Sequence, residues 1–439
     1  MDKSIYCGGK QLSFMWRSNL SIPKMVRVRQ KIYAPKIDDY ISALREELNK
    51  SGLRDKIKPG AKIAIAVGSR GIAHIAEIVA SIVEEVKKAG GEPFIVPAMG
   101  SHGGATPEGQ IAVLKSLGIT RESVGAPIQA TMEVKEVGRL SNGAPVYVDK
   151  AAANADGIIV VNRIKPHTDF KGRIESGLMK MMAIGLGKQK GAEIIHRYQL
   201  EGYHKLIPEA AKVIMEKTPI ILGVAIVENA RHEIALIRAL KPEEIEEEEA
   251  KLLEIAKDLM ARIPFREIDV LIVDEMGKNI SGTGMDTNVI GRFWASPEEY
   301  EPRAPKIKRI VVLDLTEESR GNAVGIGLAD ITTKRLVSKI DFEETFVNCF
   351  TSTWPETAKI PPFLPSDRDA ILMAIRCCGP IDPEKAKIVR IKNTLELEYM
   401  WISESLCELV KRDKDLSERI EILGEPEEMQ FDVLGNLAK

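Results

Sequence analysis

The sequence predicts an α/β protein with two α/β domains, largely parallel sheets, and an active site in the cleft between the domains. Short apolar runs rich in Val and Ile alternate with segments that have apolar residues at helical spacing, and Gly or Pro interrupts the chain between them. This alternation is typical of parallel sheets joined by crossover helices. A chain of 439 residues is also long enough to build two such domains, each with its own core.

The clearest of these units starts near residue 61. Residues 61–67 (AKIAIAV) predict a strand, residues 72–91 an amphipathic helix that ends in Gly-Gly, and residues 93–99 (PFIVPAM) a second strand. Thr106 and Pro107 then supply the N-cap and the first-turn proline of another helix. We therefore expect the first half of the chain to build on a strand–helix–strand–helix unit.

The same alternation continues along the chain. We expect further strands at 156–164, 219–229, 269–276, 309–315 and 387–393, and helices at 37–52, 176–183, 189–198, 206–218, 242–262 and 366–379. Pro264 separates a long charged helix from a fresh apolar run and marks the preferred boundary. The sequence therefore predicts an N-terminal catalytic domain over 1–265 and a C-terminal domain over 266–439 that closes the cleft.

Composition excludes several classes of protein. With 62 basic and 64 acidic residues, the chain has no basic excess that would bind nucleic acid. No apolar stretch reaches the roughly 18 residues of a membrane span, and the N-terminus shows no signal-peptide pattern. The five cysteines show neither metal-ligand nor disulfide spacing. We therefore expect a cytoplasmic protein that binds a small molecule, with no nucleic acid or membrane as partner.

Three predicted strands lead into loops that carry residues suited to catalysis. Arg70 lies in GSRG, His102 in MGSHGGAT and His167 in RIKPHTDFKG. Because the carboxyl ends of parallel strands meet at one edge of a sheet, we expect these side chains to share a pocket. A histidine, with a pKa of about 6.5, exchanges protons near neutral pH, and an arginine binds a carboxylate or phosphate through two N–H groups.

Two helical segments add a lysine and a third histidine. Lys180 lies in the apolar run LMKMM, where burial would lower its pKa and make its amine a nucleophile. His196 lies in EIIHRY, and Lys188 lies in the Gly-rich turn IGLGKQKG, which would suit a phosphate. Each residue also has a structural interpretation: a histidine can satisfy a turn or pack within a helix, and a lysine can extend to the helix surface.

Taken together and in this order, SRG, GSHGGAT, KPHTDF, Lys180 and His196 resemble the lactate racemase family, the isomerases that depend on a nickel-pincer nucleotide. The resemblance implies that the N-terminal domain binds pyridinium-3,5-bisthiocarboxylic acid mononucleotide, a derivative of nicotinic acid mononucleotide that grips nickel through two sulfurs and a ring carbon. Lys180 would join this cofactor through a thioamide, and His196 would ligate the nickel.

The resemblance also implies a reaction. A 2-hydroxy acid would lose the hydride on Cα, become a planar keto acid and regain the hydride on either face, so the enzyme would be a racemase or an epimerase. His102 and His167 would be the catalytic acid/base pair, one for each enantiomer, and Arg70 would bind the substrate. Cofactor-biosynthesis enzymes would be required as partners.

The chain departs from the family pattern at several positions. Val67-Gly68-Ser69 stand where the family has an aspartate, and we expect Ser69, like Lys188, to bind the cofactor. The loop at 277–294 lacks the family's Tyr-Gln, and the expected stand-ins are Trp294 and Arg292, the latter as a substrate-binding residue. These differences favour a hydroxy acid other than lactate.

Two other functions are compatible with the same residues. A zinc-dependent hydrolase would use His102, His167 and His196 as ligands, because three histidines can hold catalytic zinc. No two of the three stand at a short spacing that would form such a site in advance. A non-catalytic protein that binds a nucleotide or a hydroxy acid is the other alternative.

Overall fold

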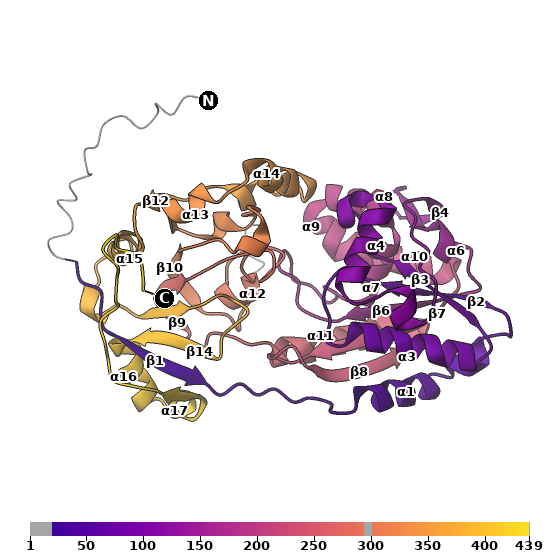
Figure 1. The fold of residues 1–439 in the computed structure, drawn as a ribbon, viewed down its shortest axis with the longest axis horizontal. Helices are drawn as coiled ribbons and strands as arrows, with labels where there is room; N and C mark the ends of the chain where they lie inside the picture. The colour runs from indigo at the N-terminus through magenta and orange to yellow at the C-terminus, as the bar shows by residue number, and fades with distance from the viewer. Residues whose placement is uncertain (1–19, 294–300, 439) are drawn as a thin grey trace.

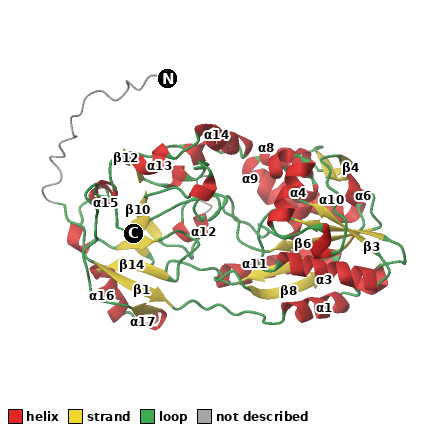
Figure 2. Cartoon of the chain, in the orientation of Figure 1, coloured by secondary structure: helices red, strands yellow, loops and turns green. Residues whose placement is uncertain are grey.

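The structure is a computed structural model and describes residues 20–293 and 301–438. Two α/β units lie side by side, each built on its own sheet (Figure 1, Figure 2). The five-stranded sheet has the order β3-β2-β6-β7-β8, and the eight-stranded sheet has the order β12-β11-β10-β9-β13-β14-β1-β15. The predicted fold class, two α/β domains, is therefore confirmed.

The five-stranded sheet is parallel except at one edge, where β8 pairs antiparallel with β7. Its strands are β2 (Lys62–Val67), β3 (Glu92–Pro97), β6 (Gly157–Arg163), β7 (Ile220–Glu228) and β8 (Ile234–Leu240). The first four agree with predicted strands to within two residues at each end. The sequence does not predict β8, which has a mixed burial pattern.

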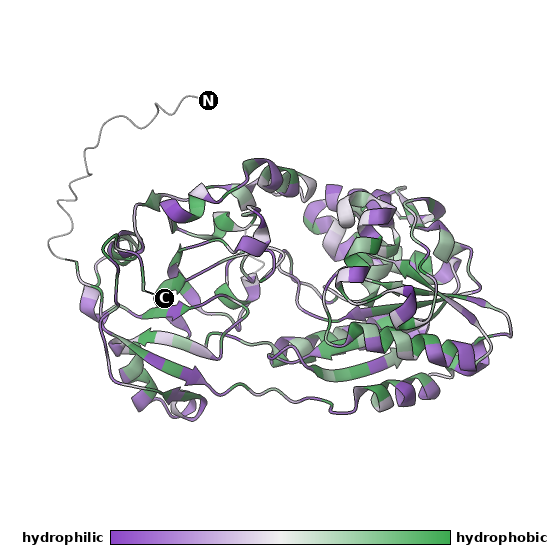
Figure 3. Ribbon diagram, in the orientation of Figure 1, coloured by the Kyte–Doolittle hydropathy of each residue, from purple (hydrophilic) through white to green (hydrophobic). Residues whose placement is uncertain are grey.

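Helices cover both faces of this sheet because alternate side chains of each strand point to opposite faces. Ile63, Ile65 and Val67 of β2 pack on one core, and Ala64 and Ala66 pack on the other. Apolar residues are concentrated in the strands of both sheets (Figure 3). One core includes α1 (Tyr40–Lys50), α2 (Leu53–Lys56), α3 (Ile75–Lys88), α4 (Pro107–Ser116) and α5 (Arg121–Val124).

The second core of this unit carries the helices that matter for the site. It includes α6 (Lys150–Ala153), α7 (Leu178–Lys180), α8 (Lys188–Arg197), α9 (Gln199–Glu201), α10 (Ile207–Lys217), α11 (Ile245–Leu259) and the hairpin of β4 (Val134–Arg139) and β5 (Pro145–Asp149). A π-helical stretch, Met181–Leu186, joins α7 to α8. Such stretches are frequent at functional sites.

The eight-stranded sheet is mixed. Its parallel part is β12 (Phe363–Leu364), β11 (Ile331–Thr333), β10 (Lys306–Val312), β9 (Glu267–Val273) and β13 (Ile388–Ile391). The antiparallel part is β14 (Tyr399–Ser403), β1 (Met25–Gln30) and β15 (Ile420–Ile422). Its helices are α12 (Thr287–Ile290), α13 (Lys334–Ser338), α14 (Phe342–Thr351), α15 (Asp367–Arg376), α16 (Glu404–Arg412) and α17 (Lys414–Arg419).

Strand β1 lies in the second unit, although it comes first in the described chain. It pairs with β14 and β15, and its buried Val26 and Val28 join the core of that sheet. An extended segment then crosses to α1 of the first unit (Figure 1). The predicted first domain, 1–265, includes the β1 segment. That assignment is wrong for β1, because strand pairing places this strand in the sheet of the C-terminal half.

The loops at the carboxyl ends of β2, β3, β6 and β7 face the loop that follows β9 of the second unit, and residues from all five loops line one cavity. This placement follows from parallel topology, which gathers the carboxyl ends of the strands at one edge. Within the described ranges, no helix is both long enough and apolar enough to cross a membrane.

Candidate active site

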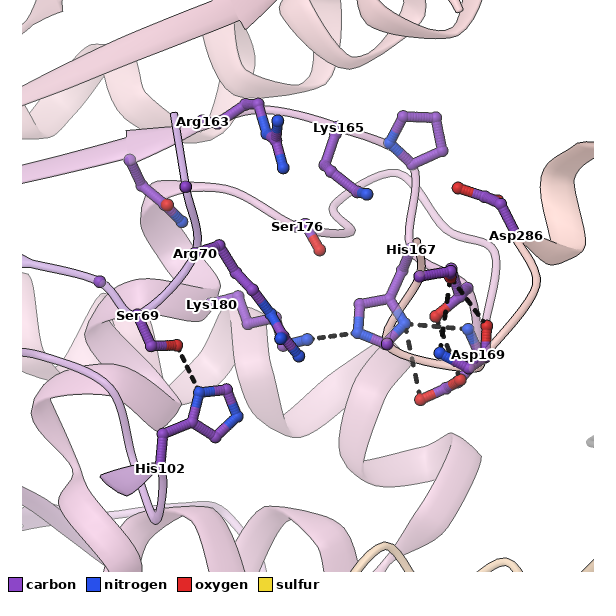
Figure 4. A pocket seen from close by; sticks show the side chains of 18 of the residues that line it. Ser69, Arg70, His102, Arg163, Lys165, His167, Asp169, Ser176, Lys180 and Asp286 are labelled. Carbon is purple, nitrogen blue, oxygen red and sulfur yellow. Dashed lines mark hydrogen bonds and ion pairs between the residues drawn. The ribbon is translucent and has the colours of Figure 1, made fainter. Parts of the chain in front are cut away.

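A cavity of about 790 Å³ lies between the two units. The first unit contributes the loops after its parallel strands together with α7 and α8, and the second unit contributes the loop after β9, residues of α14 and the turn that follows it. Six residues singled out in the sequence line it together: Arg70, His102, His167, Lys180, His196 and Ser69. The first four of these side chains come together in Figure 4.

Arg70 extends into the cavity from the loop after β2. Among the described residues it has no hydrogen-bond or ion-pair partner, and its neighbour Arg163 is already paired with Glu228. Burial, and after it the positive charge of Arg163, lowers the pKa of Arg70, but a guanidinium stays charged at physiological pH. A charged guanidinium without an ion-pair partner inside a cavity is able to bind an anion.

Ser69 holds the ring of His102. The Ser69 hydroxyl and His102 Nδ1 are hydrogen-bonded, as Figure 4 shows. Burial, and after it the positive charge of Arg70, lowers the pKa of His102 to about 3. The ring is therefore neutral at physiological pH and able to accept a proton. Ser69 also lines the cavity. The predicted contact between Ser69 and a cofactor remains a prediction, whereas its hydrogen bond to His102 is part of the structure.

His167 is fixed on three sides. Its Nδ1 accepts a hydrogen bond from the backbone N–H of Asp169 at 3.0 Å, and its own backbone N–H donates to the buried Glu175 carboxylate at 2.7 Å. The ring packs on Phe170 with centroids 4.6 Å apart. Burial, and after it the charge of Lys180, lowers the pKa of His167 well below its usual value. This second imidazole is therefore neutral too.

Lys180 reaches the cavity from the end of α7, and its amine contacts His167 Nε2. The start of α7 is held by Glu249 of α11, which accepts the N–H of Met179 at 3.0 Å. Gly177 makes room for that carboxyl group, since a Cβ there would lie 2.1 Å from Glu249 Oε1. Burial lowers the pKa of Lys180 to about 8. The structure thus supplies the buried amine that the sequence predicts.

His196 faces the same cavity from α8, where its ring meets Tyr203 edge-on with centroids 5.9 Å apart. Burial, and after it the charge of Lys180, lowers the pKa of His196 to about 4. A neutral imidazole keeps a lone pair that can bind a metal ion. The second unit touches this helix directly, because the Thr353 hydroxyl donates to the His196 carbonyl at 3.5 Å.

Two lysines complete the cavity although the sequence does not single them out. Lys278, after β9, donates to the Gly282 carbonyl at 2.5 Å and to Asn348 Oδ1 at 2.7 Å. Lys165 stands two positions before His167, and the KPH motif itself was the available signal. Burial lowers the pKa of each lysine to about 8. Both line the cavity, so its wall is richer in cations than the sequence motifs suggest.

Lys188 lies apart from the cavity, which corrects the expectation that it contacts the cofactor. It is fully buried beneath the loop that carries His102. Its amine donates to the Pro97 carbonyl at 2.5 Å and to Gln110 Oε1 at 2.7 Å, and it lies 3.2 Å from Asp149 Oδ2. These three oxygens engage the amine fully, so its role is structural.

Arg292 is also placed elsewhere, which corrects its expected role in substrate binding. Its guanidinium lies 2.6 Å from the Asp330 carboxylate and donates to the carbonyls of Leu328 and Ile307, and it is not among the residues that line the cavity. The second unit's cation at the cavity is Lys278 instead. Trp294, the other expected stand-in, lies outside the described residues.

The three histidines do not form a ligand cluster. Over 20–293 and 301–438, no group of three or more His, Cys, Asp or Glu side chains comes close enough to hold a metal ion. The ligand set of the zinc alternative, His102 with His167 and His196, is therefore not assembled. What the cavity does assemble is two neutral imidazoles, a buried amine, a third imidazole and unpaired cations, which can bind an anion and move protons.

Fold and cavity together define a two-unit α/β protein with an enzyme-like site between its units. Residues 19–204 match the family model described as the lactate racemase N-terminal domain, and this range contains Arg70, His102, His167, Lys180 and His196. This part of the chain therefore matches the lactate racemase N-terminal domain, and the resemblance seen in its motifs is confirmed.

Two solved structures show a distant likeness to most of the chain. The lactate racemase apoprotein from Thermoanaerobacterium thermosaccharolyticum has 12% identity and a TM-score of 0.48, with 84% of this chain and 94% of that chain covered. A protein from Thermotoga maritima has 15% identity and a TM-score of 0.48, with 81% and 96% covered. No curated protein sequence matches the chain.

Proposed function

We propose that this protein is an isomerase, a racemase or epimerase, that acts on a 2-hydroxy acid and carries a nickel-pincer nucleotide on Lys180. One observation carries the proposal: the buried amine of Lys180, the neutral imidazoles of His102, His167 and His196, and the unpaired Arg70 line one cavity. All five residues lie within the part of the chain that matches the lactate racemase N-terminal domain.

The donor groups fit such a cofactor. Lys180 would hold the nucleotide through a thioamide, and its lowered pKa makes the reactive free amine accessible near neutral pH. His196 would ligate nickel, since its neutral ring keeps a lone pair and imidazole suits this metal. When bound, the nickel-pincer nucleotide supplies a centre that accepts the hydride of Cα and returns it. Enzymes that build this nucleotide are the partners that the proposal requires.

Arg70 and Lys278 would bind the carboxylate of the substrate. Arg70 comes from the first unit and Lys278 from the second, and both approach Gly282. An anion between them would neutralise two neighbouring cations that have no ion-pair partner among the described residues, although the Asp169 carboxylate acts favourably on both from farther away. Held in this way, the keto acid stays bound while it presents its other face, so that hydride return to either face is possible.

His102 and His167 would handle the hydroxyl proton. The hydroxyl group of the substrate must lose its proton when Cα loses a hydride, and it must regain one when the hydride returns. Both rings are neutral because burial lowers their pKa values, and a neutral imidazole has one nitrogen that can accept a proton and one that can donate a proton. The two enantiomers present their hydroxyl groups on different sides of the site. Each histidine would therefore serve the hydroxyl group of one enantiomer.

The test is to produce the full chain together with the cofactor-building enzymes and to measure intact mass, nickel content and activity on a panel of 2-hydroxy acids. We expect an adduct that Lys180→Ala abolishes and nickel that His196→Ala removes. Lys165→Ala, which alters another cavity lysine, is the matched control and should keep the adduct. A chain with cofactor bound that neither racemises nor epimerises any acid in the panel would contradict the enzymatic proposal.

A further inference from the structure

The contact between Lys180 and His167 fixes the protonation state of both side chains. Lys180 Nζ lies within hydrogen-bonding distance of His167 Nε2, as the dashed line in Figure 4 marks. In such a bond one nitrogen provides the hydrogen and the other provides a lone pair. Which nitrogen does which depends on the second nitrogen of the imidazole ring.

That second nitrogen, Nδ1, acts as an acceptor. It receives the backbone N–H of Asp169 at 3.0 Å, and a peptide N–H can only donate. The Asp169 carboxylate lies 3.9 Å from Nδ1, too far to accept a hydrogen from it. Nδ1 therefore carries no hydrogen, and the single hydrogen of the neutral ring lies on Nε2.

With a hydrogen on Nε2, Lys180 must supply the lone pair, and only an uncharged amine has one. We propose that His167 holds Lys180 as a free amine, through donation from Nε2–H to Nζ, and so prepares it to bond with the thiocarboxyl carbon of the nucleotide. The identity of this electrophile rests on the proposed function, whereas the state of the pair follows from the hydrogen bonds alone.

The surroundings of Lys180 favour the same state. Burial is the largest cause of its lowered pKa, and the charges of Arg70 and Lys165 act in the same direction, whereas Asp169 and Glu175 oppose them. The titratable and charged groups that face the amine are Asp169, Glu175, Arg70, Lys165, His102, His167 and His196. Lys165 is also buried and has a similarly lowered pKa, but among the described residues no hydrogen bond joins its amine to a histidine ring.

The bond-forming step balances without an oxidant or a reductant. Lys180 Nζ attacks the carbon of a thiocarboxylate, so that a C–N bond forms and the C–O bond breaks. The oxygen leaves as water with one proton from the amine and one from solvent, and the sulfur remains as a thioamide. A thioamide nitrogen no longer offers a lone pair, so His167 Nε2 is released. Attachment at Lys180 therefore frees the Nε2–H of His167, which can then donate to the substrate oxygen.

The first test reads the tautomer directly by nuclear magnetic resonance on the full chain, produced without cofactor-building enzymes and labelled with ¹⁵N at histidine. His167→Asn assigns the signal by its loss. Near pH 7.5 we expect His167 to be neutral with its hydrogen on Nε2. A ring with hydrogen on Nδ1, or a doubly protonated ring, would overturn the proposal.

The second test measures each lysine by trace acetylation with acetic anhydride at a series of pH values, read by peptide mass spectrometry. His167→Asn removes the donor at Nε2 and should raise the titration midpoint of Lys180 by about one pH unit, an approximately tenfold change in free amine. Lys165 is the internal control and should shift by much less. His167→Gln, whose amide N–H can take the place of Nε2, should restore the midpoint.

Equal shifts at Lys180 and Lys165 would assign the effect to water entry alone and overturn the proposal, as would an unchanged Lys180. His167→Gln and the tautomer measurement on the unsubstituted chain remain decisive if His167→Asn does not fold. These outcomes are separate from those of the proposed function. An adduct on Lys180 together with a His167 ring in the other tautomer would overturn the pairing and leave the isomerase proposal standing.

Discussion

The guanidinium of Arg70 in the first unit lies against Gly282 of the second unit, with Nη2 3.3 Å from the position that a Cβ on Gly282 would occupy. Lys278 donates to the carbonyl of the same glycine at 2.5 Å. The positive charge of Arg70 contributes to the lowered pKa of Lys278, second only to burial. The Asp169 carboxylate acts favourably on both cations, and a bound anion between them would relieve their repulsion further.

Substitution of Gly282 should therefore weaken anion binding while the charges of Arg70 and Lys278 are retained. The β-branched side chain of Gly282→Val would push the Arg70 guanidinium away, and we expect about a tenfold rise in the KM for the hydroxy acid, the scale of one charge-assisted hydrogen bond. Gly282→Ala should have a smaller effect, because the end of an arginine side chain can shift by a few tenths of an ångström. Steady-state kinetics of the cofactor-loaded chain measure both, and equal KM values for all three proteins would contradict this placement of Arg70.

Binding of a 2-hydroxy acid should weaken as pH rises through about 8. The pKa of Lys278 is lowered to about 8, so the ammonium is present below that pH and is lost above it, whereas Arg70 stays charged. A bound carboxylate raises the midpoint in the complex. Calorimetric titration with glycolate over a pH series measures the effect. Lys278→Arg should bind with little pH dependence, and Lys278→Met should bind weakly throughout. A pH dependence that persists in Lys278→Met would assign the titration to another group.

Much of this site could be predicted from the sequence, for a physical reason. Runs such as AKIAIAV are apolar on both faces, as a parallel strand covered by helices must be, and the residue types that follow such strands gather at one edge of the sheet. That rule alone places Arg70, His102 and His167 together although they are far apart in the chain. Lys180 was recognisable because a lysine inside the apolar run LMKMM either extends its amine to the helix surface or is buried with a function.

The placement of β1, Lys278 and Lys188 could not be predicted, because it depends on contacts with distant segments that no local sequence pattern indicates. Strand β1 pairs with β14, which is more than 350 positions away, and its short alternating run MVRVRQ would suit either sheet. Lys278 follows a strand in an ordinary turn, and only the approach of the second unit brings it to Arg70. Lys188 looks like a phosphate-binding residue in a Gly-rich turn. It is buried because Asp149 and Gln110, from distant segments, meet its amine.

Loss of one partner of the buried Lys188–Asp149 pair should destabilise the fold strongly. Lys188→Met would leave the carboxyl group of Asp149 buried without its cation, and breaking such a pair costs about 3–5 kcal/mol. The double variant Lys188→Met, Asp149→Asn removes both charges and should recover part of the loss. The free energy of unfolding in urea measures the series.

The exposed neighbour Lys190 offers the control for this series, and Lys190→Met should stay within about 0.5 kcal/mol of the unsubstituted chain. Lys188 also orients Gln110, which donates to the carbonyls of Gly100 at 2.9 Å and His102 at 3.3 Å. Amide exchange of the loop that carries His102 should therefore accelerate in Lys188→Met. Unchanged exchange there would contradict a role for the pair in holding this loop.

Glu249 should make the fold less stable in alkaline solution. Burial raises its pKa from 4.5 to about 8, so the folded state favours the protonated carboxyl group. The stabilisation is fully present below pH 4.5, the unfolded value, and is lost as pH rises through about 8. Glu249→Gln keeps a carbonyl for the Met179 N–H but cannot ionise, so between about pH 5 and pH 9 the unsubstituted chain should lose roughly 3–5 kcal/mol relative to it. Urea unfolding at a series of pH values measures this difference, and parallel pH profiles for the two proteins would show that Glu249 is ionised in the folded state without such a penalty.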